Sequence, residues 1–168
     1  MNKIKEKIPN YKVYLIAISV LIIDQITKIL VMNNMNLGEE ITIIDKFFSL
    51  IYLTNTGAAF STFENQRMFI IIASVFCSAL IISLMQKEKD MTKLKIISFG
   101  ILIGGMFSNL IDRVIYKHVI DFFAFTIFSY RFPIFNIADI GITIGVFLYL
   151  ILSLKSDKEE IKKVVKNK

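Results

Sequence analysis

Residues 68–85 read MFIIIASVFCSALIISLM and contain no charged side chain. A helix of this length, at about 1.5 Å per residue, is close to the ~30 Å thickness of the hydrocarbon core of a bilayer. Three further apolar stretches of similar length lie at about 13–32, 96–111 and 133–154. A backbone in lipid must satisfy its own hydrogen bonds, and four strands cannot close a barrel. The sequence therefore predicts an all-α membrane protein with four transmembrane helices.

The composition of the whole chain agrees with a membrane location. Hydrophobic residues make up 55% of the 168 residues, Phe occurs 15 times, and the mean hydropathy is +0.62. Such a chain has too little polar surface for a water-soluble domain, and its length fits one domain over residues 1–168. The net charge of +6 does not indicate nucleic-acid binding, because the basic residues form blocks between apolar runs.

The distribution of Lys and Arg predicts the orientation of the spans. Residues 1–12, the link after the second span and the tail from Lys155 together hold fourteen basic residues, against five in the other two connections. Because basic residues concentrate on the cytoplasmic side, both termini are predicted to be cytoplasmic. The first span carries Asp24 and Lys28 and is followed by no small-x-small cleavage site, so a retained anchor is favoured over a signal peptide.

The two remaining connections are predicted to lie outside the cell membrane. Residues 33–67 form a long connection, and within it 41–54 is rich in Ile, Phe, Leu, Tyr and Thr, which predicts two or three short strands. Residues 112–132 mix aromatic and charged side chains and are expected to lie along the outer membrane surface. Long external segments of this kind are where a functional site is commonly built.

Small residues recur at a spacing of four in the last two spans. Gly100, Gly104 and Ser108 form one row in the third span, and Gly141 and Gly145 form another in the fourth. Rows of this kind let helices approach closely in lipid. A seam between the third and fourth spans is favoured, and a dimer interface is the alternative.

Two carboxylates near the outer end of the fourth span are the main candidates for chemistry. Asp139 lies six residues after Pro133, which places it roughly 9 Å into the predicted helix, and Asn136 precedes it by three positions on the same face. Asp121 lies in an apolar context in the preceding external segment. Ionisable groups in or beside a membrane are costly and usually mark function.

Convergence of these two carboxylates would suit peptide hydrolysis through a shared proton. Close like charges cannot both ionise, so one carboxyl stays protonated while the other takes a proton from an attacking water molecule. The pattern indicates no metal and no cofactor, since the chain has a single His, His118, and no His/Cys cluster.

Four motifs, in order along nearly the whole chain, resemble those of the bacterial lipoprotein signal peptidases, also called signal peptidase II. The first two are Asp24-Gln25-Ile26-Thr27-Lys28 and Asn55-Thr56-Gly57-Ala58-Ala59-Phe60. The third is Asn109-Leu110-Ile111-Asp112-Arg113 followed by Val119-Ile120-Asp121-Phe122, and the fourth is Phe135-Asn136-Ile137-Ala138-Asp139. The family usually has Gly before the Asn of the third motif, where this chain has Ser108.

This resemblance implies a membrane aspartic endopeptidase of the bacterial cell membrane, with its active site at the extracytoplasmic face. Its substrate would be a diacylglyceryl-modified prolipoprotein, cleaved just before the lipidated cysteine. The resemblance also implies a small extracytoplasmic β-cradle and a short surface helix. We further expect contact with membrane lipid, no nucleic-acid partner and a monomer. By position, Asp121 and Asp139 match the catalytic pair, and the supporting polar set is Asp24, Lys28, Asn55, Gly57, Asn109, Arg113 and Asn136.

Several simpler interpretations remain open at this point. Asp24 and Lys28 are four residues apart and either neutralise each other or contact substrate directly. Asp112 and Arg113 could form an ordinary pair at a helix end, and Asn55 could be only a turn residue. Two other functional classes are a small proton-coupled membrane carrier and a non-catalytic membrane assembly factor.

Overall fold

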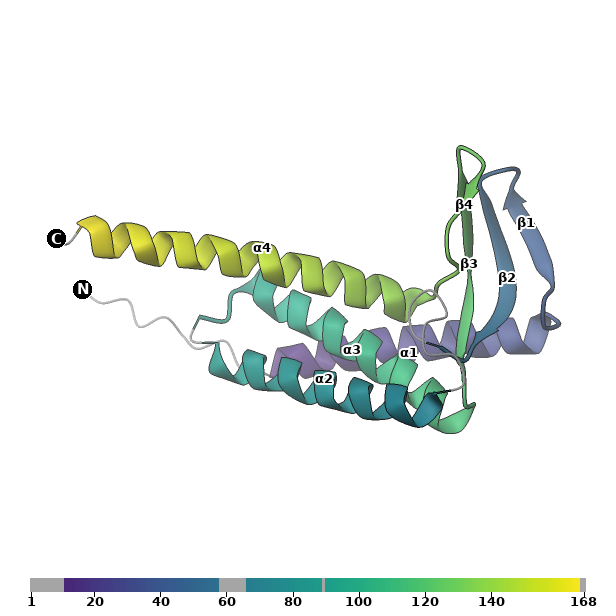
Figure 1. Cartoon of the computed structure of the whole chain (residues 1–168), viewed down its shortest axis with the longest axis horizontal. Helices are drawn as coiled ribbons and strands as arrows, with labels where there is room; N and C mark the ends of the chain where they lie inside the picture. Colours follow the sequence, from purple (N-terminus) through teal and green to yellow (C-terminus); the bar gives the residue numbers. More distant parts are fainter. Residues whose placement is uncertain (1–10, 58–65, 89, 167–168) are drawn as a thin grey trace.

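A computed structural model of the chain shows four long helices and one small antiparallel sheet (Figure 1). It describes residues 11–57, 66–88 and 90–166, with the side chains of 156–166 left aside. The helices and strands, in chain order, are α1 (Tyr11–Asn34), β1 (Glu40–Ile44), β2 (Phe48–Asn55), α2 (Arg67–Lys87), α3 (Lys93–Ile115), β3 (Val119–Ile127), β4 (Tyr130–Arg131) and α4 (Ile137–Lys166).

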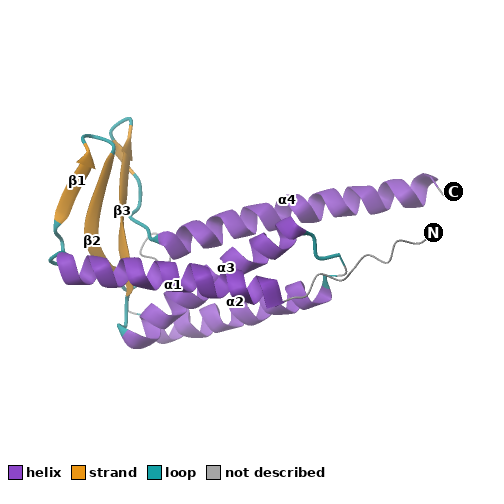
Figure 2. Cartoon of the chain, turned by 180° about the vertical axis from the view of Figure 1, so that it is seen from behind, coloured by secondary structure: helices purple, strands orange, loops and turns teal. Residues whose placement is uncertain are grey.

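Each of the four helices is long and apolar enough to cross a membrane, which confirms the predicted spans. α3 lies between the others and is the most buried: 61% of its span is covered, against 11–17% for α1, α2 and α4. The outward faces of those three helices carry exposed Leu, Ile, Val and Phe side chains. A surface this apolar is suited to lipid. The sheet stands across one end of the bundle, and α1 begins and α4 ends at the opposite end (Figure 2).

The start of the fourth helix differs from the prediction. The apolar run begins at Pro133, but α4 begins at Ile137. Phe135 instead bridges to Phe123 of β3, with backbone hydrogen bonds in both directions. Hydropathy cannot separate an apolar segment that joins a sheet from one that continues a helix, because both bury apolar side chains.

The small residues of α3 contact two helices, not one. A Cβ at Gly104 would lie 2.5 Å from the carbonyl oxygen of Ala17, and one at Gly100 would lie 2.7 Å from the side chain of Ile16, so this row faces α1. The α3–α4 contact is made by Gly105 of α3, which meets Ala138, together with Gly141 and Gly145 of α4. The predicted seam between the third and fourth spans therefore exists, but Gly100 and Gly104 do not belong to it.

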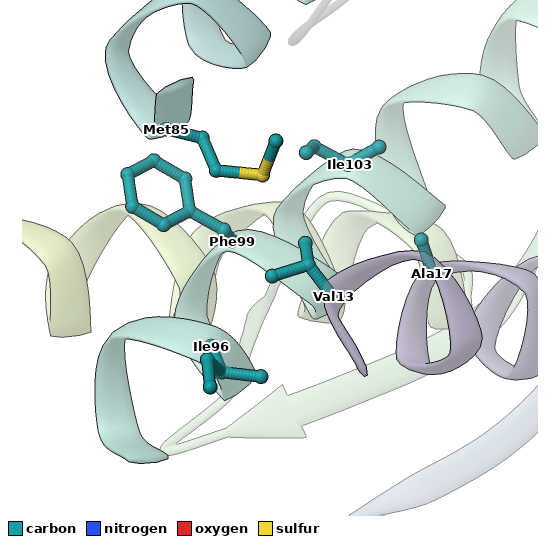
Figure 3. Packing of buried hydrophobic residues seen from close by; sticks show 6 residues of the cluster. All are labelled: Val13, Ala17, Met85, Ile96, Phe99 and Ile103. Carbon is teal, nitrogen blue, oxygen red and sulfur yellow. The ribbon is translucent and has the colours of Figure 1, made fainter. Parts of the chain in front are cut away.

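An apolar cluster joins α1, α2 and α3 toward the end away from the sheet. The side chain of Met85 from α2 lies beside Phe99 and Ile103 of α3 (Figure 3). Val13 and Ala17 of α1 complete the contact. In lipid, close packing of this kind and interhelical hydrogen bonds hold helices together. The Ser98 hydroxyl, which donates to the carbonyl oxygen of Gly145 at 2.8 Å, supplies one such bond to α4.

The sheet has the strand order β1-β2-β3-β4, with every neighbouring pair antiparallel. β1 and β2 confirm the strands predicted within 41–54. β3 was not predicted: its run of Ile, Phe and Ala is buried on both faces and lacks the alternation that marks a half-exposed strand. The second outer segment thus holds strands, while residues 58–65 of the first lie outside the described residues, as does the Ala58–Phe60 end of the second motif.

Candidate active site

Asp121 is the third residue of β3 and is 4% exposed. Its Oδ2 accepts a hydrogen bond from the side-chain amide of Asn55 at 3.1 Å, and its Oδ1 accepts one from that of Asn136 at 2.7 Å. The antiparallel register pairs Leu53 with Asp121 and Asn55 with Val119, which brings the end of β2 beside the carboxylate. Asn55 also closes a turn by accepting from the backbone N–H of Gly57 at 3.0 Å, so it serves both as a turn residue and as a partner of Asp121.

Asp139 lies in the first turn of α4, and not about 9 Å along it, because the helix begins at Ile137. Asn136 and Asp139 cap the helix reciprocally. The Asp139 N–H donates to Asn136 Oδ1 at 2.9 Å, and the Asn136 N–H donates to Asp139 Oδ2 at 3.2 Å. A carboxylate at this position also interacts favourably with the helix dipole. The shared polar face predicted for these two residues is therefore a helix cap.

Two buried carboxamides connect the carboxylates. The Asn136 side-chain amide donates to Asp121 and also to Asn109 Oδ1 and the Ile120 carbonyl oxygen, both at 3.2 Å. The side-chain amide of Asn109 donates to Asp139 Oδ1 at 2.8 Å. Asp121 and Asp139 thus come from different elements but share one hydrogen-bonded network, which is the convergence that the sequence predicts.

A second network lies behind the first and is fully buried. Lys28 forms ion pairs with Asp24 Oδ2 and Asp112 Oδ2, both at 2.7 Å, and donates to Asn109 Oδ1 at 3.0 Å. Lys28, Asp24 and Asp112 each have 0% exposure. This burial favours the neutralising pair over direct substrate contact for Asp24 and Lys28. It also shows that Asp112 pairs with α1 and not with its neighbour Arg113.

The same network includes Gln25, Ser108 and Asp112, which were not among the predicted site residues. Gln25 donates to Asp112 Oδ1 at 2.7 Å and to the Ser108 hydroxyl at 3.0 Å, and that hydroxyl donates to Asp24 Oδ2 at 2.7 Å. Asp24 Oδ1 accepts from the backbone N–H of Ala138 at 2.8 Å, which ties α1 to the start of α4. The available signal was spacing, since Ser108 and Asp112 are four residues apart and share one face of α3.

Arg113 completes the wall of the site on α3. Its guanidinium donates to the carbonyl oxygens of Asn109 at 3.1 Å and Gly57 at 3.3 Å, so it links α3 to the turn after β2. Arg67, at the start of α2, donates to the carbonyl oxygens of Arg113 and Val114 at 2.9 and 3.0 Å. These bonds satisfy carbonyl groups that the end of α3 leaves free and fix α2 beside the site. The role of Arg67 was not anticipated.

The surroundings of Asp121 favour its protonated form. Burial raises the pKa of Asp121 to about 7, and the neighbouring charge of Asp139 acts in the same direction. The hydrogen bonds from Asn55 and Asn136 and the charge of Lys28 oppose this rise in pKa. A carboxyl group with this balance can hold a proton at neutral pH.

A groove of about 1080 Å³ opens from the site along the bundle. Asp121, Asp139, Asn55, Asn109 and Arg113 line its polar end. The rest is lined by apolar side chains of α2, α3 and α4 and by residues 132–135, among them Phe69, Ile70, Met106, Ile140 and Ile144. Among the described residues, no three His, Cys, Asp or Glu side chains are grouped so as to hold a metal ion.

Together, the fold and the site define a multi-pass membrane protein with a buried polar centre that faces an apolar groove. The sequence model of the family Signal peptidase (SPase) II matches residues 16–155. Two solved structures of bacterial membrane enzymes also match. One is 33% identical with a TM-score of 0.81, covering 88% of this chain and 90% of its own, and the other is 34% identical with a TM-score of 0.77, covering 85% and 92%.

This chain belongs to the signal peptidase II family, and the resemblance found in its motifs is confirmed. It is a multi-pass membrane peptidase that processes the signal peptides of lipoproteins, so its substrate is a prolipoprotein in a lipid environment. No observation favours the carrier or the assembly factor.

Proposed function

We propose that Asp121 and Asp139 are the catalytic pair of an aspartic endopeptidase that cleaves diacylglyceryl-modified prolipoproteins just before the lipidated cysteine. The observation that carries this proposal is the network in which Asn136 donates to both carboxylates while both line one groove. Asn55, Asn109 and Asn136 orient the two carboxyl groups, and Arg113 lines the polar end of the groove and donates to the carbonyl oxygen of Gly57. No metal, cofactor or nucleic-acid partner is expected.

The reaction needs one ionised and one protonated carboxyl group. The ionised carboxylate takes a proton from water as the oxygen attacks the peptide carbonyl carbon, and the protonated carboxyl gives its proton to the carbonyl oxygen. When the tetrahedral intermediate collapses, the first carboxyl protonates the leaving nitrogen. The second then recovers a proton from a hydroxyl of the intermediate, so both groups return to their starting states. The raised pKa of Asp121 supports this arrangement.

The apolar groove supports the choice of substrate. It runs from the carboxylates along α2 and α4, so it offers apolar surface to acyl chains and to the apolar segment of a signal peptide. Acyl chains held in lipid would present the scissile bond at the end of the bundle where the sheet lies. The small residues of α3 contact α1 and α4 of the same chain, so they are not free to form a dimer interface, which supports a monomer.

The main test replaces each carboxylate with its amide, which preserves shape but removes the ionised form. Asp121→Asn and Asp139→Asn are expected to lower kcat by about 1000-fold or more on a diacylglyceryl-modified precursor while the protein stays folded, because both groups take part in proton transfer. Initial rates of purified protein in detergent or lipid give the measurement.

A matched control and a second substrate sharpen this test. Asp45→Asn makes the same change at an exposed turn between β1 and β2 and should keep full activity. The wild-type protein should cut a precursor without the diacylglyceryl group much more slowly. Near-normal cleavage by either Asp variant would end the proposal for the pair, and equal rates on both precursors would end the proposal for lipid recognition.

The proposed extracytoplasmic position of the site has its own test. Phe128, at the turn between β3 and β4, is fully exposed. In a Cys77→Ser background, Phe128→Cys is expected to react with a membrane-impermeant maleimide added to intact spheroplasts, because the positive-inside rule places the sheet outside. Labelling only after the cells are lysed would place the sheet and the carboxylates on the cytoplasmic side.

A further inference from the structure

Lys28 uses all of its hydrogen-bonding capacity inside the protein. An ammonium group has three N–H donors, and the three partners of Lys28 are Asp24, Asp112 and Asn109, at 2.7, 2.7 and 3.0 Å. The side chain has 0% exposure and does not line the groove. Lys28 therefore has no free donor for substrate, and apart from its charge, which acts on the carboxylates at a distance, it reaches them only through these partners.

Asn109 is the partner that leads to the carboxylate pair. Its Oδ1 accepts from Lys28 Nζ and also from the amide of Asn136. Its Nδ2 donates to Asp139 Oδ1 at 2.8 Å. If the carboxamide turned over, its NH₂ group would face two donors, and its oxygen would face the carboxylate oxygen of Asp139. A buried contact of that kind is costly, so Lys28 fixes the orientation in which Asn109 donates to Asp139.

The two carboxylates differ in what surrounds them. Asp139 lies in the first turn of α4, where the helix dipole favours negative charge. It accepts hydrogen bonds from the backbone N–H of Asn136 and from the side-chain amide of Asn109. Asp121 lies in a strand and, within the described residues, accepts hydrogen bonds only from the side-chain amides of Asn55 and Asn136. The charged or titratable groups around the pair are Asp24 and Lys28 on α1, Asp112 and Arg113 on α3, and the two carboxylates themselves, with the Cys77 thiol of α2 further along the groove.

We propose that Lys28 is a positioning residue, which holds Asn109 so that Asp139 is the ionised member of the pair and Asp121 the protonated one. This inference rests on the proposed catalytic function of the two carboxylates. In the reaction written above, Asp139 then takes the proton of the attacking water and later protonates the leaving nitrogen. Asp121 protonates the carbonyl oxygen and recovers its proton from the intermediate.

The first experiment removes the amide that reaches Asp139 and leaves Lys28 with its two carboxylate partners. Asn109→Leu is expected to move the acid limb of the pH profile of kcat/KM upward by about one pH unit, because the ionised form of Asp139 loses a hydrogen-bond donor. Such a shift corresponds to about a tenfold loss of activity on that limb. An unchanged acid limb in an active Asn109→Leu protein would overturn the proposal.

The second experiment removes Lys28 together with one of its two carboxylate partners, so the net charge of the three side chains stays at −1 and Asp24 keeps its bonds from Ser108 and the Ala138 N–H. Lys28→Met alone would leave two buried carboxylates without a counter-ion. It is therefore combined with Asp112→Asn, and this double variant is compared with the single variant Asp112→Asn. Relative to that reference, the double variant should show the same upward shift of the acid limb with a nearly unchanged KM, since Lys28 does not line the groove. A loss of activity with no shift of the limb would show that Lys28 only supports folding.

A double-mutant cycle decides whether Lys28 acts through Asn109. In an Asn109→Leu background, removal of Lys28 should shift the acid limb clearly less than it does when Asn109 is present, because only the charge of Lys28 still acts on the pair. A shift of the same size in both backgrounds would mean that Lys28 acts by its charge alone, which contradicts the proposed positioning role.

A second buried lysine, which lies on α3, supplies a matched control. Lys95 forms an ion pair with Glu88 at the end of α3 away from the sheet and is 6% exposed. Lys95→Met with Glu88→Gln should lower thermal stability but leave the pH profile unchanged. If this control shifts the acid limb as the Lys28 variant does, the shift reports weakened packing and the proposal fails. The proposed catalytic function would still stand as long as Asp121→Asn and Asp139→Asn remain inactive.

Discussion

The two ends of α3 both bury polar side chains, but they arrange them differently. At the end away from the sheet, Lys95 pairs with Glu88 across a tight connection, and Ser98 donates to a backbone carbonyl of α4. At the sheet end, Ser108, Asn109 and Asp112 bond to side chains from α1 and α4 in one connected network. The first arrangement joins elements in pairs. The second converges on two carboxylates that face a groove.

This difference shows what buried polarity does in this protein. An isolated polar pair can fasten helices in lipid, where an unsatisfied group is expensive. A connected network can in addition fix the direction of every donor and acceptor in it, because each amide has only one orientation that satisfies its neighbours. Catalysis needs such fixed directions, since donors must already point to where charge develops.

The largest expected effect comes from removing one hydrogen-bonding side chain near each end of α3 and comparing the two variants. Asn136→Ala removes the donor to Asp121 and the acceptor that caps Asp139, so kcat on the lipid-modified precursor should fall by about 100-fold or more. Ser98→Ala removes an interhelical bond of similar length at the other end and should leave kcat unchanged. Initial rates and thermal unfolding of both variants provide the comparison. Equal losses of activity would mean that both ends serve folding alone.

A smaller effect is expected from pH. The pKa of Asp121 is raised to about 7, so this group is protonated below that pH and loses its proton above it. If the protonated form is required, kcat/KM should fall about tenfold for each pH unit above about 7. Asn55→Ala removes a hydrogen bond that lowers this pKa, so it should move the alkaline limb to higher pH. A limb that stays in place in Asn55→Ala would assign the titration to another group.

The same shift has a consequence for stability. An Asp whose pKa is higher in the folded than in the unfolded protein favours folding while both forms are protonated, below about pH 4. That contribution is lost as the pH rises toward the folded-state pKa near 7. The protonated Asp121 that the reaction uses therefore costs stability at neutral pH, a cost that the hydrogen bonds from Asn55 and Asn136 reduce.

The smallest effect is expected at the edge of the sheet, outside both networks. Arg131 and Glu40 form an ion pair at 3.0 Å, with side chains that are 46% and 35% exposed. Exposed pairs of this kind contribute about 0–1 kcal/mol and weaken with salt. Arg131→Ala should therefore shift the thermal midpoint by only a few degrees and leave kcat unchanged. A large loss of activity would show that the sheet edge takes part in the reaction.

Several features of the site could be predicted from the sequence because they depend on local spacing. Asp139 follows Asn136 by three positions, and Asp24 precedes Lys28 by four, so each pair meets within one turn wherever it lies in the fold. Asn109 and Arg113 share a helix face for the same reason. The details that failed were those set by distant segments. The cap at the start of α4 depends on Phe135 joining β3, and the partner of Asp112 is on α1 and not beside it in sequence.

Hydropathy and charge by themselves determined that this chain crosses a membrane four times, because in lipid such long apolar runs satisfy their backbone hydrogen bonds only as helices. Only the tertiary structure decided which helix Gly100 and Gly104 contact, which strand carries Asp121, and how Lys28 reaches Asp139 through Asn109. These relations join residues up to 111 positions apart, as Lys28 and Asp139 are, and the packing of α3 against α1 and α4 creates them. Spacing along the chain records which side chains share a face, but not which neighbour that face will meet.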